Sequence, residues 1–242
     1  MKISLCIPLY NEEKILPETV RTVSEYMSET FGDDYEIIYI NDGSTDQSQA
    51  ILNRESNPRV RVISYRENRG KGYAVRRGMT SASGDIVLFT DCDLAYGLDV
   101  VREFLIYFEE HPDTDLLIGS RALHPEGYAG YSFLRRCISK LYMRVLSVFG
   151  GFRLSDSQSG IKGFRREMAR RVFSVSEVDR FAFDFEAILL TKHFGGKIDE
   201  YPVKIIHNRP SSIHFFKDSI RMMRDVLKMK KKIKKIKKET SV

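Results

Sequence analysis

Tryptophan is absent from this chain of 242 residues, and cysteine and proline are scarce, at 3 and 7 residues. The cysteines, Cys6, Cys92 and Cys137, are odd in number and far apart, and none belongs to a CxxC pair. This pattern excludes a disulfide scaffold and a cysteine-ligated zinc site, and it favours a reducing compartment. The sequence also has no run of 18 apolar residues and no signal-peptide layout. We therefore expect a cytoplasmic chain without a membrane-spanning helix.

The charge is distributed unevenly along the chain. The net charge is +6, yet residues 228–238 contain eight lysines and no acid, so the remainder carries −2. Apolar residues recur there at helical steps of four and three, at Met222, Val226, Met229, Ile233 and Ile236. We expect residues 216–242 to form a basic amphipathic helix and tail, which is typical of a segment lying on an anionic membrane. A solvated helix end and a short coiled coil are the alternatives.

Apolar runs and helical periodicities alternate along the first half of the chain. The predicted strands are residues 3–9, 35–40, 60–64, 86–90 and 115–118, and the predicted helices are 13–30, 47–55, 70–82 and 98–110. Such alternation predicts an α/β domain with a mainly parallel sheet flanked by helices, whose ligands bind at the carboxyl ends of the strands. After residue 125 the alternation breaks. We expect an amphipathic helix at 131–149, a short strand at 161–164, a helix at 183–194 and a returning strand at 197–206.

Two acids, Asp91 and Asp93, follow the predicted strand 86–90 with one residue between them. Side chains two apart on an extended chain point the same way, so both carboxylates can reach one point. Hard oxygen ligands of this kind suit Mg²⁺ or Mn²⁺ together with phosphate oxygens. A polar turn that caps the next helix and a glycosidase-type acid and base pair are the alternatives.

Four motifs in order carry a family resemblance. They are Pro8-Leu9-Tyr10-Asn11-Glu12, the run from Asn41 to Asp46, Asn68-Arg69-Gly70-Lys71-Gly72, and Asp91-Cys92-Asp93. Together they resemble glycosyltransferase family 2, and the resemblance covers roughly residues 1–215. It implies the GT-A (Rossmann-like) fold, a nucleotide-sugar donor and inversion at the anomeric carbon.

The resemblance also implies a donor site. In the family, positions matching Pro8, Tyr10, Glu12 and Asp42 line the base and ribose pocket. Lys71, between two glycines at a predicted helix start, can approach a diphosphate, although an exposed surface lysine is the plain alternative. Arg209, beside a Pro-Ser-Ser segment, is expected to close over the donor phosphates, and a surface-loop arginine is its alternative.

The later motifs indicate a branch of the family. A QxxRW motif, carried by processive polysaccharide synthases, is impossible without tryptophan. The segment 119–121, the pair Arg135-Arg136 with Ser139, and the DxQxGxK run 156–162 resemble polyprenyl-phosphate sugar transferases, and the last is closest to the dolichyl-phosphate glucosyltransferases.

This branch implies how the acceptor is held. Residues matching Arg121, Arg135 and Ser139 hold the acceptor phosphate, which suits the forked guanidinium of arginine. Mannosyl relatives can place a glutamine as a further metal ligand where this chain has Ala95, so Asp91 and Asp93 are expected to share the metal with the diphosphate and water.

The expected function is transfer of a hexose, with glucose favoured, from a nucleotide sugar to a polyprenyl phosphate at the inner face of a membrane. A UDP-sugar is the favoured donor and a GDP-sugar the second option. Helix 131–149 would lie on the bilayer, although core packing with a basic solvent face is its alternative. An integral membrane protein is a conceivable partner.

Two other functions stay open. One is a family 2 transferase that adds sugar to a glycan hydroxyl with Asp156 as base. The other is a membrane-tethered scaffold that binds nucleotide sugar without turnover. For the leading function Asp156 is expected to orient the site, in contact with Arg121 or Arg135. A nucleic-acid partner is not expected, because the body is acidic and has no recognised nucleic-acid module.

Overall fold

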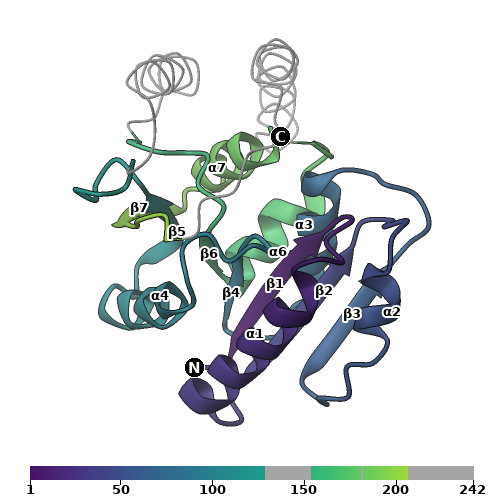
Figure 1. Ribbon diagram of the computed structural model, residues 1–242. Helices are drawn as coiled ribbons and strands as arrows, with labels where there is room; N and C mark the ends of the chain where they lie inside the picture. The colour runs from purple at the N-terminus through teal and green to yellow at the C-terminus, as the bar shows by residue number, and fades with distance from the viewer. Residues whose placement is uncertain (129–153, 181, 207–242) are drawn as a thin grey trace.

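A computed structural model describes residues 1–128, 154–180 and 182–206. Over this part of the chain a seven-stranded sheet has the order β3-β2-β1-β4-β6-β5-β7 (Figure 1). The strands are β1 (Ile3–Leu9), β2 (Tyr35–Asn41), β3 (Val60–Ser64), β4 (Ile86–Phe89), β5 (Thr114–Ser120), β6 (Lys162–Arg165) and β7 (Lys197–Pro202). Only β6 runs antiparallel to its neighbours, β4 and β5. The predicted α/β architecture with a mainly parallel sheet is confirmed.

Helices cover both faces of the sheet. They are α1 (Leu16–Phe31), α2 (Ser48–Leu52), α3 (Lys71–Ser81), α4 (Asp99–Glu110), α6 (Arg166–Val175) and α7 (Phe183–His193). Alternate residues of each central strand point to opposite faces, so Ile38 and Ile40 pack with α3, α6 and α7, whereas Ile37 and Tyr39 pack with α1, α2 and α4. The central strands β1, β2 and β4 are buried throughout, which explains why they are nearly continuous apolar runs, whereas the edge strands β3 and β7 are partly exposed.

Several predicted boundaries and one helix differ from expectation. Helix α2 covers Ser48–Leu52 rather than 47–55, and β5 covers Thr114–Ser120 rather than 115–118. The returning strand ends at Pro202 rather than Ile206, and β6 is shifted one residue from the predicted 161–164. Helix α6 was not predicted. It follows β6 without a connecting loop, and its buried face of Met168, Ala169, Val172 and Phe173 is short.

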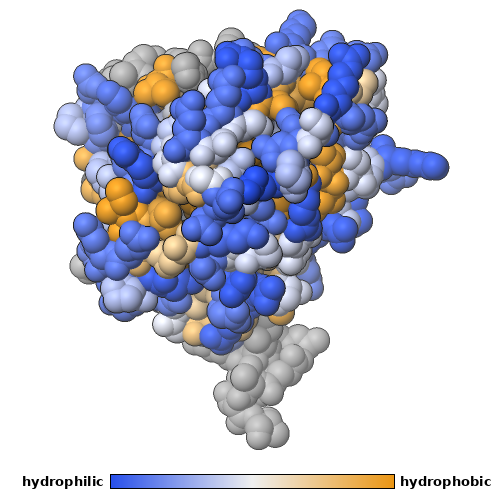
Figure 2. All heavy atoms as spheres, turned by 90° about the horizontal axis from the view of Figure 1, so that it is seen from below, coloured by the Kyte–Doolittle hydropathy of each residue, from blue (hydrophilic) through white to orange (hydrophobic). Residues whose placement is uncertain are grey.

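The register brings the strand ends to one edge. Leu9 pairs with Asn41, and β4 lies beside β1 with Cys6 opposite Phe89. The loops after β1, β2 and β4 therefore leave the sheet side by side. Seen from below, on the face away from this edge, the surface is mostly hydrophilic, with hydrophobic side chains in separate patches (Figure 2).

Candidate donor and acceptor site

The loops after β1 and β2 hold each other in place. The Asn11 amide donates to Ser44 Oγ at 2.9 Å, and the Thr45 amide donates to Asn11 Oδ1 at 2.8 Å. Asn11 adopts φ +56°, a left-handed conformation that asparagine tolerates better than most residues. The turn leaves the Tyr10 side chain outside the core, 45% exposed, at the edge where the strands end. The Tyr10 ring is thus available to a ligand, and its place in the base and ribose pocket remains a prediction.

Asp42 organises the neighbouring loop. Its carboxylate accepts from Asn68 Nδ2 at 3.0 Å, from the Arg69 amide at 2.9 Å and from the Gly70 amide at 2.9 Å, and the residue is only 3% exposed. Asp42 therefore holds the loop of residues 68–70 that precedes α3. This structural role was not predicted from the sequence.

The turn that carries Asp91 and Asp93 is tightly constrained. Leu94 is held at φ +48°, which costs a branched residue on the order of 1 kcal/mol. The Ala95 amide donates to Asp93 Oδ1 at 3.2 Å, and Thr19 of α1 donates its hydroxyl to the Cys92 carbonyl at 2.9 Å. A strained turn that is fixed from several sides keeps its carboxylates preorganised.

Lys71 lies beside this turn and forms an ion pair with Asp91. Burial by itself lowers the pKa of Lys71, but the charges of Asp91, Asp184 and Asp93 outweigh it, so the pKa is raised and the ammonium stays charged. The start of α3 packs against residues 178–180, where a Cβ on Gly72 would collide with the Val178 carbonyl. The two glycines around Lys71 thus allow a close approach of backbones, which places the lysine at the acidic turn.

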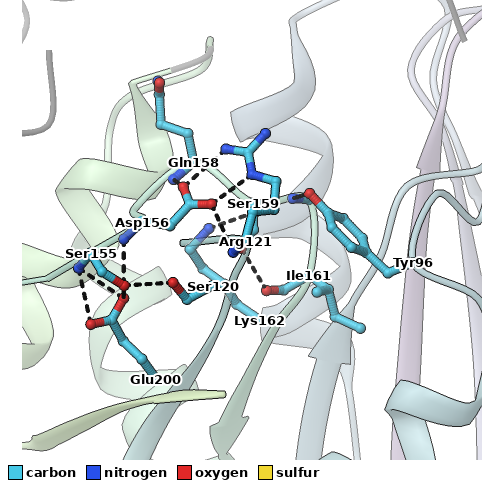
Figure 3. A network of polar contacts seen from close by, with 11 residues as sticks. Tyr96, Ser120, Arg121, Ser155, Asp156, Gln158, Ser159, Ile161, Lys162 and Glu200 are labelled. Carbon is cyan, nitrogen blue, oxygen red and sulfur yellow. Dashed lines mark hydrogen bonds and ion pairs between the residues drawn. The ribbon is translucent and has the colours of Figure 1, made fainter. Parts of the chain in front are cut away.

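Asp156 and Arg121 form the second half of the site, at the carboxyl end of β5 (Figure 3). Arg121 donates through Nε at 2.6 Å and through Nη2 at 2.9 Å to the two oxygens of Asp156, and its amide donates to Asp156 Oδ2 at 3.2 Å. Burial alone raises the pKa of Asp156, but the charge and hydrogen bonds of Arg121 outweigh it and hold that pKa below its ordinary value. The expected contact between Asp156 and Arg121 is present.

Glu200 of β7 supports this pair, and no pattern in the sequence pointed to it. Its carboxylate accepts from the Ser155 amide and hydroxyl at 2.9 and 2.7 Å and from the Asp156 amide at 3.0 Å. Ser155 also shares a hydrogen bond of 2.6 Å with Ser120 (Figure 3). An isolated glutamate in a strand has no distinguishing pattern, so only the pairing of β7 with β5 could bring Glu200 to this place.

Gly160 joins the two halves. A Cβ on Gly160 would collide with Asp91 Oδ2, and its amide donates to the Tyr96 hydroxyl at 3.3 Å. Burial raises the pKa of Tyr96 above its ordinary range, so the hydroxyl stays protonated. Gly160 therefore lies between Asp91 and the segment that carries Asp156, at the carboxyl ends of the strands (Figure 3).

A buried ion pair lies beneath this region and was also missed. Lys162 is fully buried and donates through Nζ to Asp184 Oδ1 of α7 at 2.7 Å and to the Ser159 carbonyl at 2.8 Å. Burial raises the pKa of Asp184, while the charges of Lys162 and Lys71 act in the opposite direction. An acid within the apolar sequence Phe183-Asp184-Phe185 was the available signal, because such an acid needs a buried partner.

Asp91 and Asp93 can serve a divalent cation. Both are hard oxygen donors on one rigid turn, and the Asp91 side chain is 32% exposed. Among the described residues no cluster of three or more acids, histidines or cysteines could hold a metal, so a cation here needs further oxygens from a ligand or water.

Other expected residues lie outside the part of the chain that the structure describes. These are Arg135, Ser139, Arg209, helix 131–149 and the tail 216–242. Their assignments remain predictions. No helix within the described ranges is long and apolar enough to cross a membrane.

Comparison with known proteins decides the family. Residues 4–173 match the family described as Glycosyl transferase family 2. The chain belongs to this family. The resemblance read from its four motifs is thereby confirmed.

Three similar proteins carry the same description. Dolichyl-phosphate beta-glucosyltransferase of Drosophila melanogaster is 32% identical over 217 residues, which cover 84% of this chain and 67% of that protein. The Homo sapiens protein of the same description is 33% identical over 215 residues, covering 84% and 66%, and that of Saccharomyces cerevisiae is 30% identical over 222 residues, covering 83% and 66%. The chain thus spans about two thirds of the length of these relatives.

Solved structures show the same fold. Glucosyl-3-phosphoglycerate synthase from Mycobacterium tuberculosis has been solved with UDP, and with Mn²⁺, UDP-glucose and phosphoglyceric acid. Each of these two structures matches with a TM-score of 0.69 at 20% identity, over 94% of this chain and 79% of that chain. At this identity the likeness shows the GT-A fold, as expected from the family.

Proposed function

We propose that this glycosyltransferase moves glucose from UDP-glucose to a polyprenyl phosphate at a membrane surface, with inversion at the anomeric carbon. The proposal is supported by chain-wide similarity to dolichyl-phosphate beta-glucosyltransferases and by one geometric feature. Asp156 is 2% exposed and engaged on both oxygens by Arg121, and its pKa is depressed.

That feature favours an acceptor that is already ionised. A sugar hydroxyl needs a general base, and a buried carboxylate that is paired with arginine and has a lowered pKa is a weak one. A phosphate monoester carries negative charge near neutral pH and needs no such base. It needs cationic donors, and Arg121, fixed in place by Asp156, supplies a guanidinium at the site edge. Arg135 and Ser139 are proposed to complete the phosphate site.

The donor is proposed to lie across the carboxyl ends of β1, β2 and β4. Tyr10 is exposed, the Glu12 amide donates to Ser48 Oγ, and Asp42 holds the loop before α3; with Pro8 these residues are proposed to line the base and ribose pocket. Asp91 and Asp93 would hold Mg²⁺ or Mn²⁺, which when bound supplies positive charge next to the departing diphosphate. Lys71 lies within the same cluster of charges, and Arg209 is proposed to cover the donor from the segment beyond residue 206.

The enzyme is proposed to work as a peripheral protein at the cytoplasmic membrane face. The support is electrostatic, because residues 228–238 contain eight lysines and the rest of the chain is slightly acidic. An integral membrane partner is a further proposal, consistent with a lipid-linked product that must leave the surface.

A transfer assay tests the function. Purified full chain is incubated with Mg²⁺ or Mn²⁺, a panel of UDP- and GDP-sugars, and a polyprenyl phosphate, and the product is scored in the organic phase. We expect lipid-linked glucose from UDP-glucose, with inverted anomeric configuration. Asp93→Asn should abolish transfer without unfolding the protein, while the matched surface change Asp113→Asn should retain it, because the exposed Asp113 pairs with Lys197 at the far end of β7.

Two outcomes would contradict the proposal. Product in water alone, formed on a glycan hydroxyl and lost in Asp156→Asn, would favour the hydroxyl-transferring alternative. Absence of transfer from every donor, with intact binding of UDP-glucose, would favour the non-catalytic scaffold.

A further inference from the structure

Lys71 forms an ion pair with the same carboxylate that the proposed metal requires. Its Nζ contacts Asp91 Oδ1, whereas Asp91 Oδ2 lies close against Gly160, where not even a Cβ would fit. Of the two oxygens of Asp91, Oδ1 is thus the one farther from Gly160 and the one that Lys71 holds. The side chains of Lys71 and Asp91 are 27% and 32% exposed, so solutes reach both groups.

The lysine also has a second anionic neighbour. Asp184 lies near enough for its charge to act on Lys71, and it is itself paired with the buried Lys162. Asp91, Asp93 and Asp184 thus carry three negative charges against two positive ones, and the cluster is left with one net negative charge. Removing Lys71 would leave two, on a turn whose carboxylates are held in place.

We propose that Lys71 is an exchangeable counter-ion, which competes with a divalent cation for Asp91 Oδ1 and moves to the donor diphosphate when cation and nucleotide bind together. The inference rests on the proposed cation site at Asp91 and Asp93. A cation alone must displace an ammonium group from Asp91, whereas a cation that arrives with a diphosphate brings a new partner for that ammonium group. Lys71 therefore opposes binding of the cation alone and favours the cation–nucleotide pair.

The chemistry of the two cations makes the competition direct. An ammonium group and Mn²⁺ both bind carboxylate oxygens, and two positive charges a few ångströms apart repel each other. Loss of one neighbouring positive charge at a partly exposed site is expected to raise Mn²⁺ affinity by about tenfold. This sign is opposite to that expected of a residue that merely supports the fold of the turn.

Metal binding without turnover tests the proposal. Free Mn²⁺ is measured by electron paramagnetic resonance during titration of the full chain, first without nucleotide and then with UDP. Lys71→Met should bind Mn²⁺ about tenfold more tightly without nucleotide, and it should gain less affinity for UDP when Mn²⁺ is present. Lys71→Arg keeps the charge and should bind Mn²⁺ with the affinity of the unmodified protein. Lys197→Met, which removes an ion-paired lysine from the far end of β7, should also leave the Mn²⁺ affinity unchanged.

A second measurement uses the unmodified protein and does not depend on variants that fold. Brief acetylation followed by peptide mass spectrometry measures the reactivity of each lysine amine, which is lower when the amine is held in an ion pair. Lys197 is the internal reference. Mn²⁺ alone should increase labelling of Lys71 severalfold, and addition of UDP should suppress it again. Unchanged labelling at saturating Mn²⁺ would overturn the exchange.

The outcomes separate this inference from the function on which it rests. Equal or weaker Mn²⁺ binding by folded Lys71→Met overturns the counter-ion role, even if transfer is observed. Failure of the unmodified chain to bind Mn²⁺ with or without UDP overturns the cation site itself. Tighter binding by Lys71→Met without transfer to any acceptor supports the exchange and removes the proposed function alone.

Discussion

At the scale of single residues, the buried carboxylate of Asp156 is held by hydrogen bonds from Arg121. Arg121 binds it through two nitrogens, and the Arg121 side chain is itself only 16% exposed. A charge that is buried to this extent depends on its partner, because desolvation costs several kcal/mol when the partner is removed. The pair is thus fixed in place at the proposed acceptor side of the site, and its carboxylate is poorly suited to carry a proton.

We predict that Asp156→Asn lowers the free energy of unfolding by about 3 kcal/mol, since it leaves Arg121 without its counter-charge. Asp113→Asn, at an exposed ion pair with Lys197, should cost less than about 0.5 kcal/mol. Urea unfolding followed by circular dichroism measures both. Equal effects of the two changes would argue against the buried pair.

The same pair predicts a response to acid. The folded-state pKa of Asp156 lies below its unfolded value, so its contribution to stability is present above the unfolded pKa, about 4, and is lost as the pH falls through the folded value. The unmodified protein should therefore lose more stability than Asp156→Asn between pH 5 and pH 2. Parallel stability curves for the two proteins over that interval would contradict this.

At the scale of secondary-structure elements, α7 combines packing with positioning. Its first nine residues are buried on all sides, and they include Asp184 and Glu186. Glu186 accepts from the amides of Glu177 and Val178, and this segment packs against the start of α3, where the Asp179 carbonyl accepts from the Tyr73 amide. Helix α7 therefore sets the position of Lys71 through the loop that precedes it and through the charge of Asp184.

We predict strong coupling between Lys162 of β6 and Asp184 of α7. Lys162→Met and Asp184→Leu should each lower the free energy of unfolding by about 3 kcal/mol, because each leaves one buried charge unpaired. The double variant should lose at least about 2 kcal/mol less than the sum, because it removes both charges from the interior. A double-mutant cycle by urea unfolding measures this, and additive losses would show that the ion pair does not couple the elements.

At the scale of the whole molecule, charge is segregated along the chain. The described residues present a mostly hydrophilic surface on the face seen in Figure 2. Some of their charges pair with each other, such as Arg76 with Asp179. The lysines of residues 228–238 reverse the sign of the net charge from −2 to +6. We therefore expect attraction to an anionic surface to be concentrated in the last residues of the sequence.

We predict that the full chain binds vesicles containing anionic lipid and that replacement of the eight lysines in 228–238 by glutamine weakens binding at least about a hundredfold, given about 1 kcal/mol for each lysine near the surface. Cosedimentation at low and high salt measures this. Binding should fall in 0.5 M salt, where charges are screened beyond a few ångströms. Equal binding to neutral vesicles, or to anionic vesicles without the lysines, would assign the attraction to another part of the chain.

The sequence by itself determined the order of the elements and the loops that carry the chemistry. Burial on both faces of the sheet made β1, β2 and β4 nearly continuous apolar runs. Polar residues at their ends, such as Asp91 and Asp93, marked the candidate site at one edge of the sheet. These features are local, so neighbouring residues suffice to reveal them. The motifs identified the family because they lie in the loops that follow the strands, and the order of the strands sets the spacing of these loops.

Only the tertiary structure decided which charges meet. Glu200 reaches Ser155 because β7 pairs with β5, Lys162 reaches Asp184 because α7 packs beneath β6, and Lys71 reaches Asp91 because Gly70 and Gly72 let two loops close on each other. Residues 22 to 45 positions apart in the first two of these pairs carry no periodic signal of their partnership. A buried charge is tolerated only where a distant segment supplies its counter-charge, and that condition is set by packing in three dimensions.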